Sequence, residues 1–428
     1  MSTERPRRRF GRAVAILSGG TAVGQGVGLL AAPVISRVYE PQEFGRYSVV
    51  AAAATMLASV ITLRMDAAVA VPKEDEDADL LALAGVLAVT GSGLIVLAFV
   101  LLWPAGVGRL LQLPAQVAWL WPVPVAGVLT AMFLILTQLA IRRQEYGRIG
   151  LRNAIQPSVT AVSQVGLSWP MPGLGLVVGF VLGRLVGVGS LLRHATLFRK
   201  GAIRRLRARS RTLLRSYWQF PAFGMPAKAL NTVGLQIPPL LITAYFSTGD
   251  AGQYGMAFLV TSLPVTLLGA AIGQVFLSEF SADLHNDPRR ARTLFDKASV
   301  RLGGLGLVTG LGILLFGPMI FGTVLGEQWH EAGKMAQALG VASGFRLLAT
   351  PLAPALWVLR RQGLQLVLDA ARLALTVAAF VAAWRLHYGA LTAVWVYSLA
   401  MAVVYGVTWA LSRWSTRSAI HQVEDDIR

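Results

Sequence analysis

Long apolar stretches recur along the whole sequence, and each approaches the length at which a helix crosses a lipid bilayer. About 20 apolar residues span roughly 30 Å of hydrocarbon. The composition agrees, because 55% of the residues are hydrophobic and only 14% are charged, against about 25% charged in soluble domains. A soluble fold could not bury this much apolar surface, so we predict an all-α polytopic membrane protein. About twelve transmembrane helices are expected, near residues 10–35, 47–71, 80–103, 119–141, 150–169, 174–192, 220–244, 256–277, 302–321, 335–358, 364–384 and 390–411.

Positive charge alternates from one predicted loop to the next. One set of loops, which includes both termini and residues 142–152, holds 29 Lys and Arg residues, and the opposite set holds 5. Basic loops stay in the cytoplasm, so we expect both termini on the cytoplasmic side of a bacterial inner membrane. The same rule accounts for the formal net charge of +18. We therefore expect membrane lipids, and no nucleic acid, as partners.

The longest connection, residues 193–219, divides the chain into two parts. It carries nine Lys and Arg residues interleaved with apolar ones, a pattern typical of a basic amphipathic segment that lies on an anionic leaflet. We predict a six-helix lobe on each side of it, at residues 1–192 and 220–412, followed by a cytoplasmic tail at 413–428.

A trace of internal repetition supports two related halves. Pro33 and Tyr39 stand six residues apart in the first outside loop, and Pro239 and Tyr245 have the same spacing in the corresponding loop of the second half. Parallel repeats about an axis along the membrane normal are found in membrane transporters.

Two further patterns concern packing and surface charge. Glycines at four-residue spacing, Gly20-Gly24-Gly28 and Gly179-Gly183-Gly187, are expected to let neighbouring helices approach closely. The acidic run at residues 74–79 falls in a cytoplasmic loop and is expected to be solvated, with contact to a partner as the alternative.

The first eighty residues carry two motifs, PVISRVYEPQEFGRY at 33–47 and LRMDAAVAVPK at 63–73. A third block in the second half consists of Phe220-Pro221 through Asn231, Pro239, Gly252-Gln253-Tyr254, Pro264, Leu268-Gly269 and Gln274-Val275-Phe276. Together these segments resemble the Wzx-type O-antigen and oligosaccharide flippases of the polysaccharide transporter family, within the multidrug/oligosaccharidyl-lipid/polysaccharide exporter superfamily. The loop motif that carries the likeness is formed by Pro33, Arg37, Tyr39 and Gly45.

This resemblance implies two six-helix lobes around a central cavity that opens alternately to each side of the membrane. It also implies an oligosaccharide on undecaprenyl diphosphate as the substrate, as in lipopolysaccharide assembly, with polysaccharide assembly proteins as candidate partners. The sequence departs from the family at Met65-Asp66, where an aromatic residue followed by Glu is expected. Because Asp keeps the charge, the departure leaves the assignment intact.

Seven ionisable residues fall inside the predicted helices and away from their first turns, and five of them are cations. Charges within a bilayer are costly and mark functional sites, and Arg and Lys bind phosphate. Arg64, Lys228 and Arg372 each lie roughly 13 Å from the cytoplasmic end of their helix at 1.5 Å per residue, so one cationic belt is predicted. The candidate substrate-binding residues are Arg64, Arg184, Lys228, Arg346 and Arg372, and the candidate ion-coupling residues are Asp66 and Asp369.

Some of these charges have simpler interpretations. Asp369 and Arg372 stand three residues apart, which favours an ion pair within one helix. Arg64 and Asp66 stand two apart and are expected on different sides of a helix, so they should not share one site. Whether a proton, Na⁺ or neither is coupled to transport stays open.

Other classes of protein are less favoured. An enzyme acting on polyprenyl-linked sugars should carry acid and base residues outside the membrane, where Glu327, His330 and Glu331 form the only cluster. No metal-ligand spacing, nucleotide loop or nucleophile elbow accompanies them, and the chain has no cysteine. We expect no metal and no cofactor. A multidrug exporter of the same superfamily and a structural membrane scaffold are the remaining alternatives.

Overall fold

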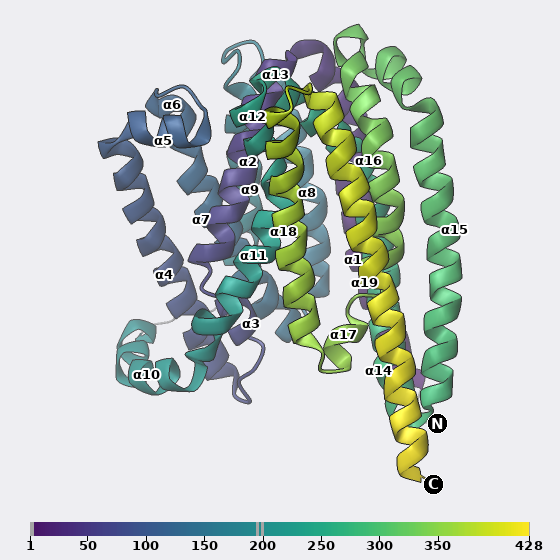
Figure 1. Ribbon diagram of the computed structural model, residues 1–428. Helices are drawn as coiled ribbons and strands as arrows, with labels where there is room; N and C mark the ends of the chain where they lie inside the picture. Colours follow the sequence, from purple (N-terminus) through teal and green to yellow (C-terminus); the bar gives the residue numbers. More distant parts are fainter. Residues whose placement is uncertain (1–3, 194–196, 198–200, 428) are drawn as a thin grey trace. The chain divides into compact units, whose positions relative to one another are not determined.

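The computed structural model describes residues 4–193, 197 and 201–427, and these residues form helices joined by short turns (Figure 1). Contacts divide the chain into two compact units, Met1–Ala244 and Tyr245–Arg428. The first unit contains α1 (Glu4–Val38), α2 (Pro41–Ile61), α3 (Met65–Ala68), α4 (Asp75–Leu102), α5 (Pro104–Leu111), α6 (Val117–Leu120), α7 (Pro122–Arg142), α8 (Tyr146–Gly166), α9 (Gly175–Leu192), α10 (Ala202–Tyr217), the π-helical turn η2 (Phe220–Gly224), α11 (Met225–Gln236) and α12 (Pro238–Tyr245).

The second unit contains longer helices, several of which are continued by a π-helical or 3-10 turn. It consists of α13 (Thr248–Pro264), η3 (Val265–Gly269), α14 (Ala270–Asn286), α15 (Pro288–Ile320), η4 (Phe321–Leu325), η5 (Glu327–Trp329), α16 (His330–Ala349), α17 (Ala355–Val358), α18 (Gln362–Arg385) and α19 (Ala390–Ile427). The last helix continues through the predicted tail at 413–428, because no glycine or proline interrupts the chain between residues 407 and 427.

Membrane-spanning character is confirmed for most of the predicted segments. Within the described ranges, nine helical segments are long and apolar enough to cross a bilayer. The other predicted segments coincide with α8, α11–α12 and α16, which are helical but lie outside that set. The fold is therefore an all-helical multi-pass membrane protein, and the total of twelve crossings in two lobes stays a prediction. The nine segments are Gly19–Val38, Pro41–Ile61, Asp75–Leu102, Val117–Arg142, Gly175–Leu192, Thr248–Leu284, Pro288–Leu325, Gln362–Arg385 and Ala390–Ser418.

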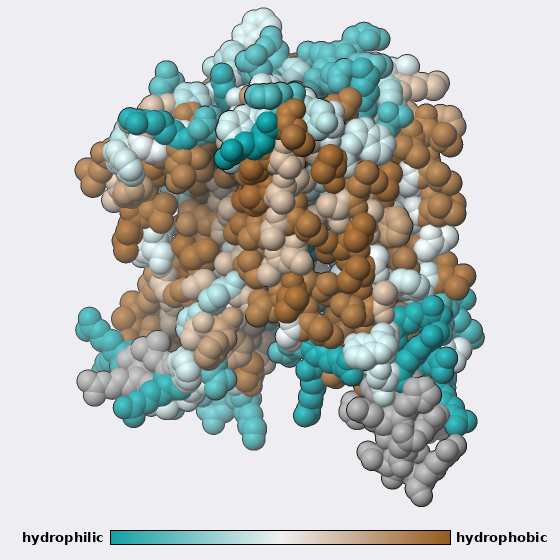
Figure 2. Space-filling view, in the orientation of Figure 1, coloured by the Kyte–Doolittle hydropathy of each residue, from teal (hydrophilic) through white to brown (hydrophobic). Residues whose placement is uncertain are grey.

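The helix surfaces show why a bilayer is needed. Only 11% of the most apolar window in Pro288–Leu325 is buried, and Leu307, Val308 and Met319 are 62%, 69% and 69% exposed. In Figure 2 hydrophobic residues cover the middle of the helices, and hydrophilic residues gather towards their ends. In water these side chains would form an unusually large exposed apolar patch, whereas in lipid they are solvated.

Glycines bring neighbouring helices into backbone contact, as predicted. A Cβ at Gly20 or Gly24 would collide with α8, and one at Gly183 or Gly187 would meet α8 side chains from α9. Gly28 is the exception, since nothing lies within 4 Å of its Cβ position. In the second unit Gly306 and Gly344 play the same role where α15 and α16 run side by side (Figure 1).

The division of the chain falls later than the predicted linker. The linker helix α10 and the broken helix α11–α12 belong to the first unit, in which α11 packs against α2. The predicted domain boundaries mark where two sequence repeats join. A division by contacts does not test such a boundary, so the boundaries stay a prediction.

Candidate functional site: a carboxylate shared by two cations

The most polar feature of the first unit lies where the second predicted membrane helix breaks. The chain turns at residues 62–64, and Leu63 and Arg64 adopt left-handed φ values of 49° and 59°. Such conformations are unfavourable for residues with a Cβ, at roughly 1–3 kcal/mol each. The short helix α3 then begins at Met65, with Arg64 as its N-cap residue. The local strain is compensated by the surrounding contacts, which hold Arg64 in place.

The break brings together two side chains that a continuous helix would separate. Arg64 Nη1 lies 3.5 Å from Asp66 Oδ2, so the expectation that these residues could not share a site is wrong. The reason is the left-handed turn, which redirects the Arg64 backbone by far more than the 100° per residue of a helix. Gly224 of η2 packs against this side chain, since a Cβ there would lie 2.8 Å from Arg64 Cγ.

Lys228 completes the arrangement, which we name the Asp66 cluster (Arg64, Asp66 and Lys228). Lys228 Nζ donates to the same carboxylate oxygen, Asp66 Oδ2, at 2.7 Å. The other oxygen, Oδ1, is buried and accepts no hydrogen bond from the residues that the structure describes. Asp66 is only 7% exposed, whereas the side chains of Arg64 and Lys228 are 29% and 18% exposed. The cluster therefore carries one net positive charge and presents its cations more openly than its carboxylate.

The third member of the predicted belt has its own counter-ion. Arg372 Nη2 lies 3.0 Å from Asp369 Oδ1 within α18, and both side chains are buried. Gln365 Nε2 donates to the same oxygen at 3.3 Å. The predicted ion pair within one helix is confirmed. The belt itself stays a prediction, because Arg372 belongs to the second unit and the Asp66 cluster to the first.

The remaining candidate cations rest on aromatic rings. The guanidinium of Arg184 lies 4.9 Å from the ring centroid of Phe180, and that of Arg346 lies 5.8 Å from the ring centroid of Phe258. Both distances are within the range of cation–π attraction. Neither residue has a carboxylate within 4.0 Å in the described part of the chain.

One buried cation was missed by the sequence analysis, which counted it in a cytoplasmic loop. Arg152 is 8% exposed and stands in the second turn of α8, with its guanidinium 3.2 Å from the ring centroid of Phe133. The sequence does contain a pattern that indicates the burial of Arg152. Polar residues recur every fourth position along α8, opposite the glycine stripe of α9, and they are Arg152, Gln156, Thr160 and Gln164.

The family loop motif has a structural role in this fold. The Tyr39 hydroxyl donates to the Gln164 carbonyl at 2.6 Å and is buried. Arg37 Nη1 donates to the carbonyl of Pro33 within α1 at 2.8 Å. Gly45 is buried in α2. These contacts fix the turn between α1 and α2 against the end of α8.

The acidic run at residues 74–79 is exposed at residues 74–76, as expected, and four of its carboxylates also form ion pairs. Asp75 accepts from Arg142 Nε at 2.9 Å, and Asp79 forms an ion pair with Arg143. From the linker helix α10, Arg209 Nη1 lies 2.9 Å from Asp77 Oδ1, and Arg205 Nη1 lies 3.6 Å from Glu76 Oε1. Two of the pairs join the run to the end of α7 and two join it to the linker helix α10, and contact with another molecule stays a prediction. The prediction that the linker lies on an anionic leaflet stays untested.

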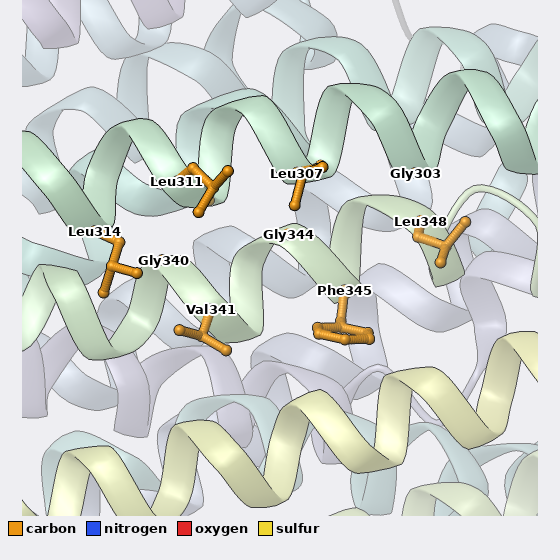
Figure 3. A pocket seen from close by; sticks show the side chains of 11 residues that line it. Gly303, Leu307, Leu311, Leu314, Gly340, Val341, Gly344, Phe345 and Leu348 are labelled. Carbon is orange, nitrogen blue, oxygen red and sulfur yellow. The ribbon is translucent and has the colours of Figure 1, made fainter.

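A separate apolar groove of about 210 Å³ runs between α15 and α16 (Figure 3). Its floor is backbone, because glycines from both helices meet there, and leucine side chains form its walls. No charged residue lines it, so it is unsuited to a phosphate headgroup and suited to an apolar chain. Its lining consists of Gly303, Gly306, Leu307, Gly310, Leu311, Leu314, Gly340, Val341, Gly344, Phe345 and Leu348.

The structure is an all-helical multi-pass bundle with Arg184, Asp369 and Arg372 inside segments long and apolar enough to cross a membrane, and charges in such segments mark functional sites. The chain belongs to the family described as polysaccharide biosynthesis proteins, whose model matches residues 34–334. This confirms the family predicted from the loop motif.

Two curated relatives are similar in sequence. The succinoglycan biosynthesis transport protein ExoT of Rhizobium meliloti (strain 1021) is 24% identical over 338 residues, which cover 74% of this chain and 63% of ExoT. The teichuronic acid biosynthesis protein TuaB of Bacillus subtilis (strain 168) is 23% identical over 211 residues, which cover 47% of this chain and 40% of TuaB. The matches therefore span less than two thirds of either relative.

Solved structures share the fold across nearly the whole chain. The lipid II flippase MurJ in an inward closed conformation has a TM-score of 0.70 at 11% identity, covering 92% of this chain and 87% of MurJ. An inward-facing multidrug resistance MATE transporter of the MOP superfamily has a TM-score of 0.66 at 14% identity, covering 96% and 95%. At these identities the likeness shows a shared fold.

Proposed function

We propose that this protein is a flippase that moves an undecaprenyl-diphosphate-linked oligosaccharide from the inner to the outer leaflet of a bacterial inner membrane. The observation that carries the proposal is the Asp66 cluster, in which two cations share one carboxylate oxygen inside a membrane helix bundle. Membership in a polysaccharide biosynthesis family and the transport role of the relative ExoT support the same class of substrate.

The geometry of the cluster suits a diphosphate. Asp66 pairs with both cations. Without it they would be unpaired charges in a poorly solvated place, and an unpaired buried charge is costly in free energy. An arriving diphosphate would offer about two negative charges to Lys228 and to the planar fork of Arg64, which binds phosphate through parallel hydrogen bonds. Charge-assisted hydrogen bonds contribute roughly 1.5–3 kcal/mol each, so two such contacts are enough to draw a headgroup from the leaflet.

We further propose how the headgroup moves through the protein after this binding step. Arg184, Arg346 and Arg372 would serve as further cationic contacts for the headgroup as the protein alternates between inward and outward openings. Asp66 and Asp369 would be the carboxylates available to a coupling ion. In this proposal both termini are cytoplasmic and the lipid-linked oligosaccharide is the partner.

A multidrug exporter is the second candidate, favoured by the fold shared with the MATE transporter. The net positive charge of the Asp66 cluster argues against it, because a cationic site repels cationic compounds and attracts anionic lipids.

The two candidates are separated by reconstitution of the full chain in liposomes. One preparation contains a fluorescently labelled sugar on undecaprenyl diphosphate, and a second contains a cationic fluorescent dye. We expect protein-dependent translocation of the lipid and none of the dye. Transport of the dye with no translocation of the lipid would contradict the flippase proposal and support the exporter.

A further inference from the structure

The basic linker helix α10 has no role in the proposed function, and it carries six arginines and no acidic residue within Ala202–Tyr217. It packs beside the start of α4 (Figure 1). The span Asp75–Leu102 has 28 residues and is roughly 42 Å long at 1.5 Å per residue, about the thickness of a bilayer with its headgroups. The start of α4, and α10 with it, is therefore expected at the level of the phospholipid headgroups.

One face of α10 packs against the helix bundle. Ala202 and Leu213 are buried in one hydrophobic cluster with residues of α4, and Leu206 and Tyr217 pack against that cluster. This apolar face is therefore unavailable to lipid, unlike the apolar face of an amphipathic helix that lies free on a membrane. Any contact of α10 with another molecule has to come from its remaining residues.

A second side of α10 is occupied by carboxylates of the protein itself. Arg205 Nη1 lies 3.6 Å from Glu76 Oε1, and Arg209 Nη1 lies 2.9 Å from Asp77 Oδ1. The two arginines stand four residues apart, which places them on the same side of the helix. Each already has a counter-ion, so an external anion would have to compete with Glu76 or Asp77 for it.

The remaining side of α10 combines exposed cationic and exposed apolar side chains. At 3.6 residues per turn these positions fall away from both the buried face and the side paired with α4. Ile203 and Trp218 are 59% and 52% exposed, and the Trp218 ring lies 5.7 Å from the ring of the exposed Phe223, between centroids. Arg204 and Arg215 form no ion pair among the described residues. We name this side the outer flank, and it consists of Ile203, Arg204, Arg207, Ala208, Arg215 and Trp218, all exposed.

We infer that the outer flank of α10 binds the headgroups of anionic phospholipids, such as phosphatidylglycerol, at the membrane surface. Arginine binds phosphate oxygens through charge-assisted hydrogen bonds, and each basic residue near an anionic leaflet strengthens the attraction about fivefold. Tryptophan prefers the level of the headgroups, because its ring is apolar and its N–H is polar. An acidic protein segment would pair with the arginines but would leave Ile203 and Trp218 in water, whereas a leaflet accommodates both kinds of side chain.

Fluorescence quenching at a single position tests this contact. The chain has no cysteine, so Ala208→Cys provides one attachment point for a fluorophore on the outer flank. The labelled full chain is placed in phosphatidylcholine nanodiscs with a small fraction of a nitroxide probe. The probe is either phosphatidylglycerol or phosphatidylcholine, with the nitroxide at the same acyl carbon near the headgroup. We expect the phosphatidylglycerol probe to quench about fivefold more than the phosphatidylcholine probe, because bound headgroups gather beside the label.

Two double variants of the labelled chain locate the contact on the helix, and all four arginines are exposed, so the fold should persist. Arg204→Gln with Arg215→Gln should make the two probes quench equally. Arg205→Gln with Arg209→Gln removes the same charge from the side paired with α4 and should keep the preference for phosphatidylglycerol.

Equal quenching by the two probes in the parent chain would overturn the inference and leave the outer flank to an acidic protein partner. Loss of the preference in both double variants would also overturn it, because net charge alone would then explain the attraction. No substrate is transported in this measurement, so its outcome is independent of the proposed function.

Discussion

At the scale of residues, the buried and half-buried cations are organised around shared carboxylates and aromatic rings. Asp66 serves Arg64 and Lys228, and Asp369 serves Arg372. Arg152, Arg184 and Arg346 rest on phenylalanine rings instead. A cation paired with a carboxylate can bind another anion only after the carboxylate is protonated or displaced. A cation that lies over an aromatic ring has no such competitor and can bind an anion directly.

The pair in α18 gives a prediction that separates a ligand from a structural partner. Arg372→Gln leaves Asp369 buried without its counter-ion, and losing one partner of a buried pair costs about 3–5 kcal/mol. We expect lower thermal stability and lower transport. Adding Asp369→Asn should restore stability, because no unpaired charge remains.

Thermal unfolding of purified protein and lipid translocation by the same preparations measure the two effects. If Arg372 contacts the diphosphate as well, the double variant should regain stability while transport stays low. Recovery of both properties would contradict a role for Arg372 in substrate binding and leave it as a partner of Asp369 alone.

At the scale of elements, the linker helix α10 is attached to the start of α4 by ion pairs. Arg205 and Arg209 reach Glu76 and Asp77 at the first turn of α4. These carboxylates also favour the N-terminus of α4, where the helix dipole is positive. Exposed pairs are individually weak, at about 0.2–1 kcal/mol, so the fastening depends on several pairs acting together.

Removing this fastening should loosen α10 without unfolding the bundle. In the double variant Arg205→Gln and Arg209→Gln, we expect amide hydrogen exchange to rise in α10 and to stay unchanged in α4 and α7. Arg204→Gln is the control, because it removes a positive charge from an exposed position of α10 that forms no ion pair among the described residues. Unchanged exchange in α10 of the double variant would mean that apolar packing of Leu206 and Leu213 holds the linker instead.

The sequence predicted elements well where the pattern is uniform and poorly where the backbone departs from a helix. Apolar periodicity located the membrane helices, and the glycine stripes on α1 and α9 identified real close contacts. The pairing of Arg64 with Asp66 could not be predicted, because it depends on the left-handed backbone conformations of Leu63 and Arg64. Such conformations are usually signalled in a sequence by glycine, and neither residue is a glycine. Arg152 was counted with the loop because it stands only two residues after the predicted helix start at 150, whereas α8 begins four residues earlier at Tyr146, and helix ends are the least regular part of the pattern.

At the scale of the whole molecule, the fold is that of a multi-pass membrane protein, the family is one of polysaccharide biosynthesis proteins, and the Asp66 cluster supplies the proposed chemistry. The sequence predicted the candidate cations and the local pair of Arg372 with Asp369. It did not predict that Lys228 pairs with Asp66, because the two residues stand 162 positions apart in the sequence. Long-range pairing is a property of the fold, so the shared carboxylate of the Asp66 cluster is seen only in the structure.

The central claim is that Arg64 and Lys228 bind the diphosphate of a translocated lipid. The most direct measurement is the initial rate at which a labelled undecaprenyl-diphosphate-linked sugar crosses proteoliposomes containing the double variant Arg64→Gln and Lys228→Gln. Two lost charge-assisted contacts predict a fall of about 100-fold or more. Because the variant also leaves Asp66 buried without a cation, the rate is normalised to the amount of folded, inserted protein. Lys334→Gln, which removes a surface partner of Glu331, should translocate at the wild-type rate. A double variant that translocates as fast as Lys334→Gln would contradict the account.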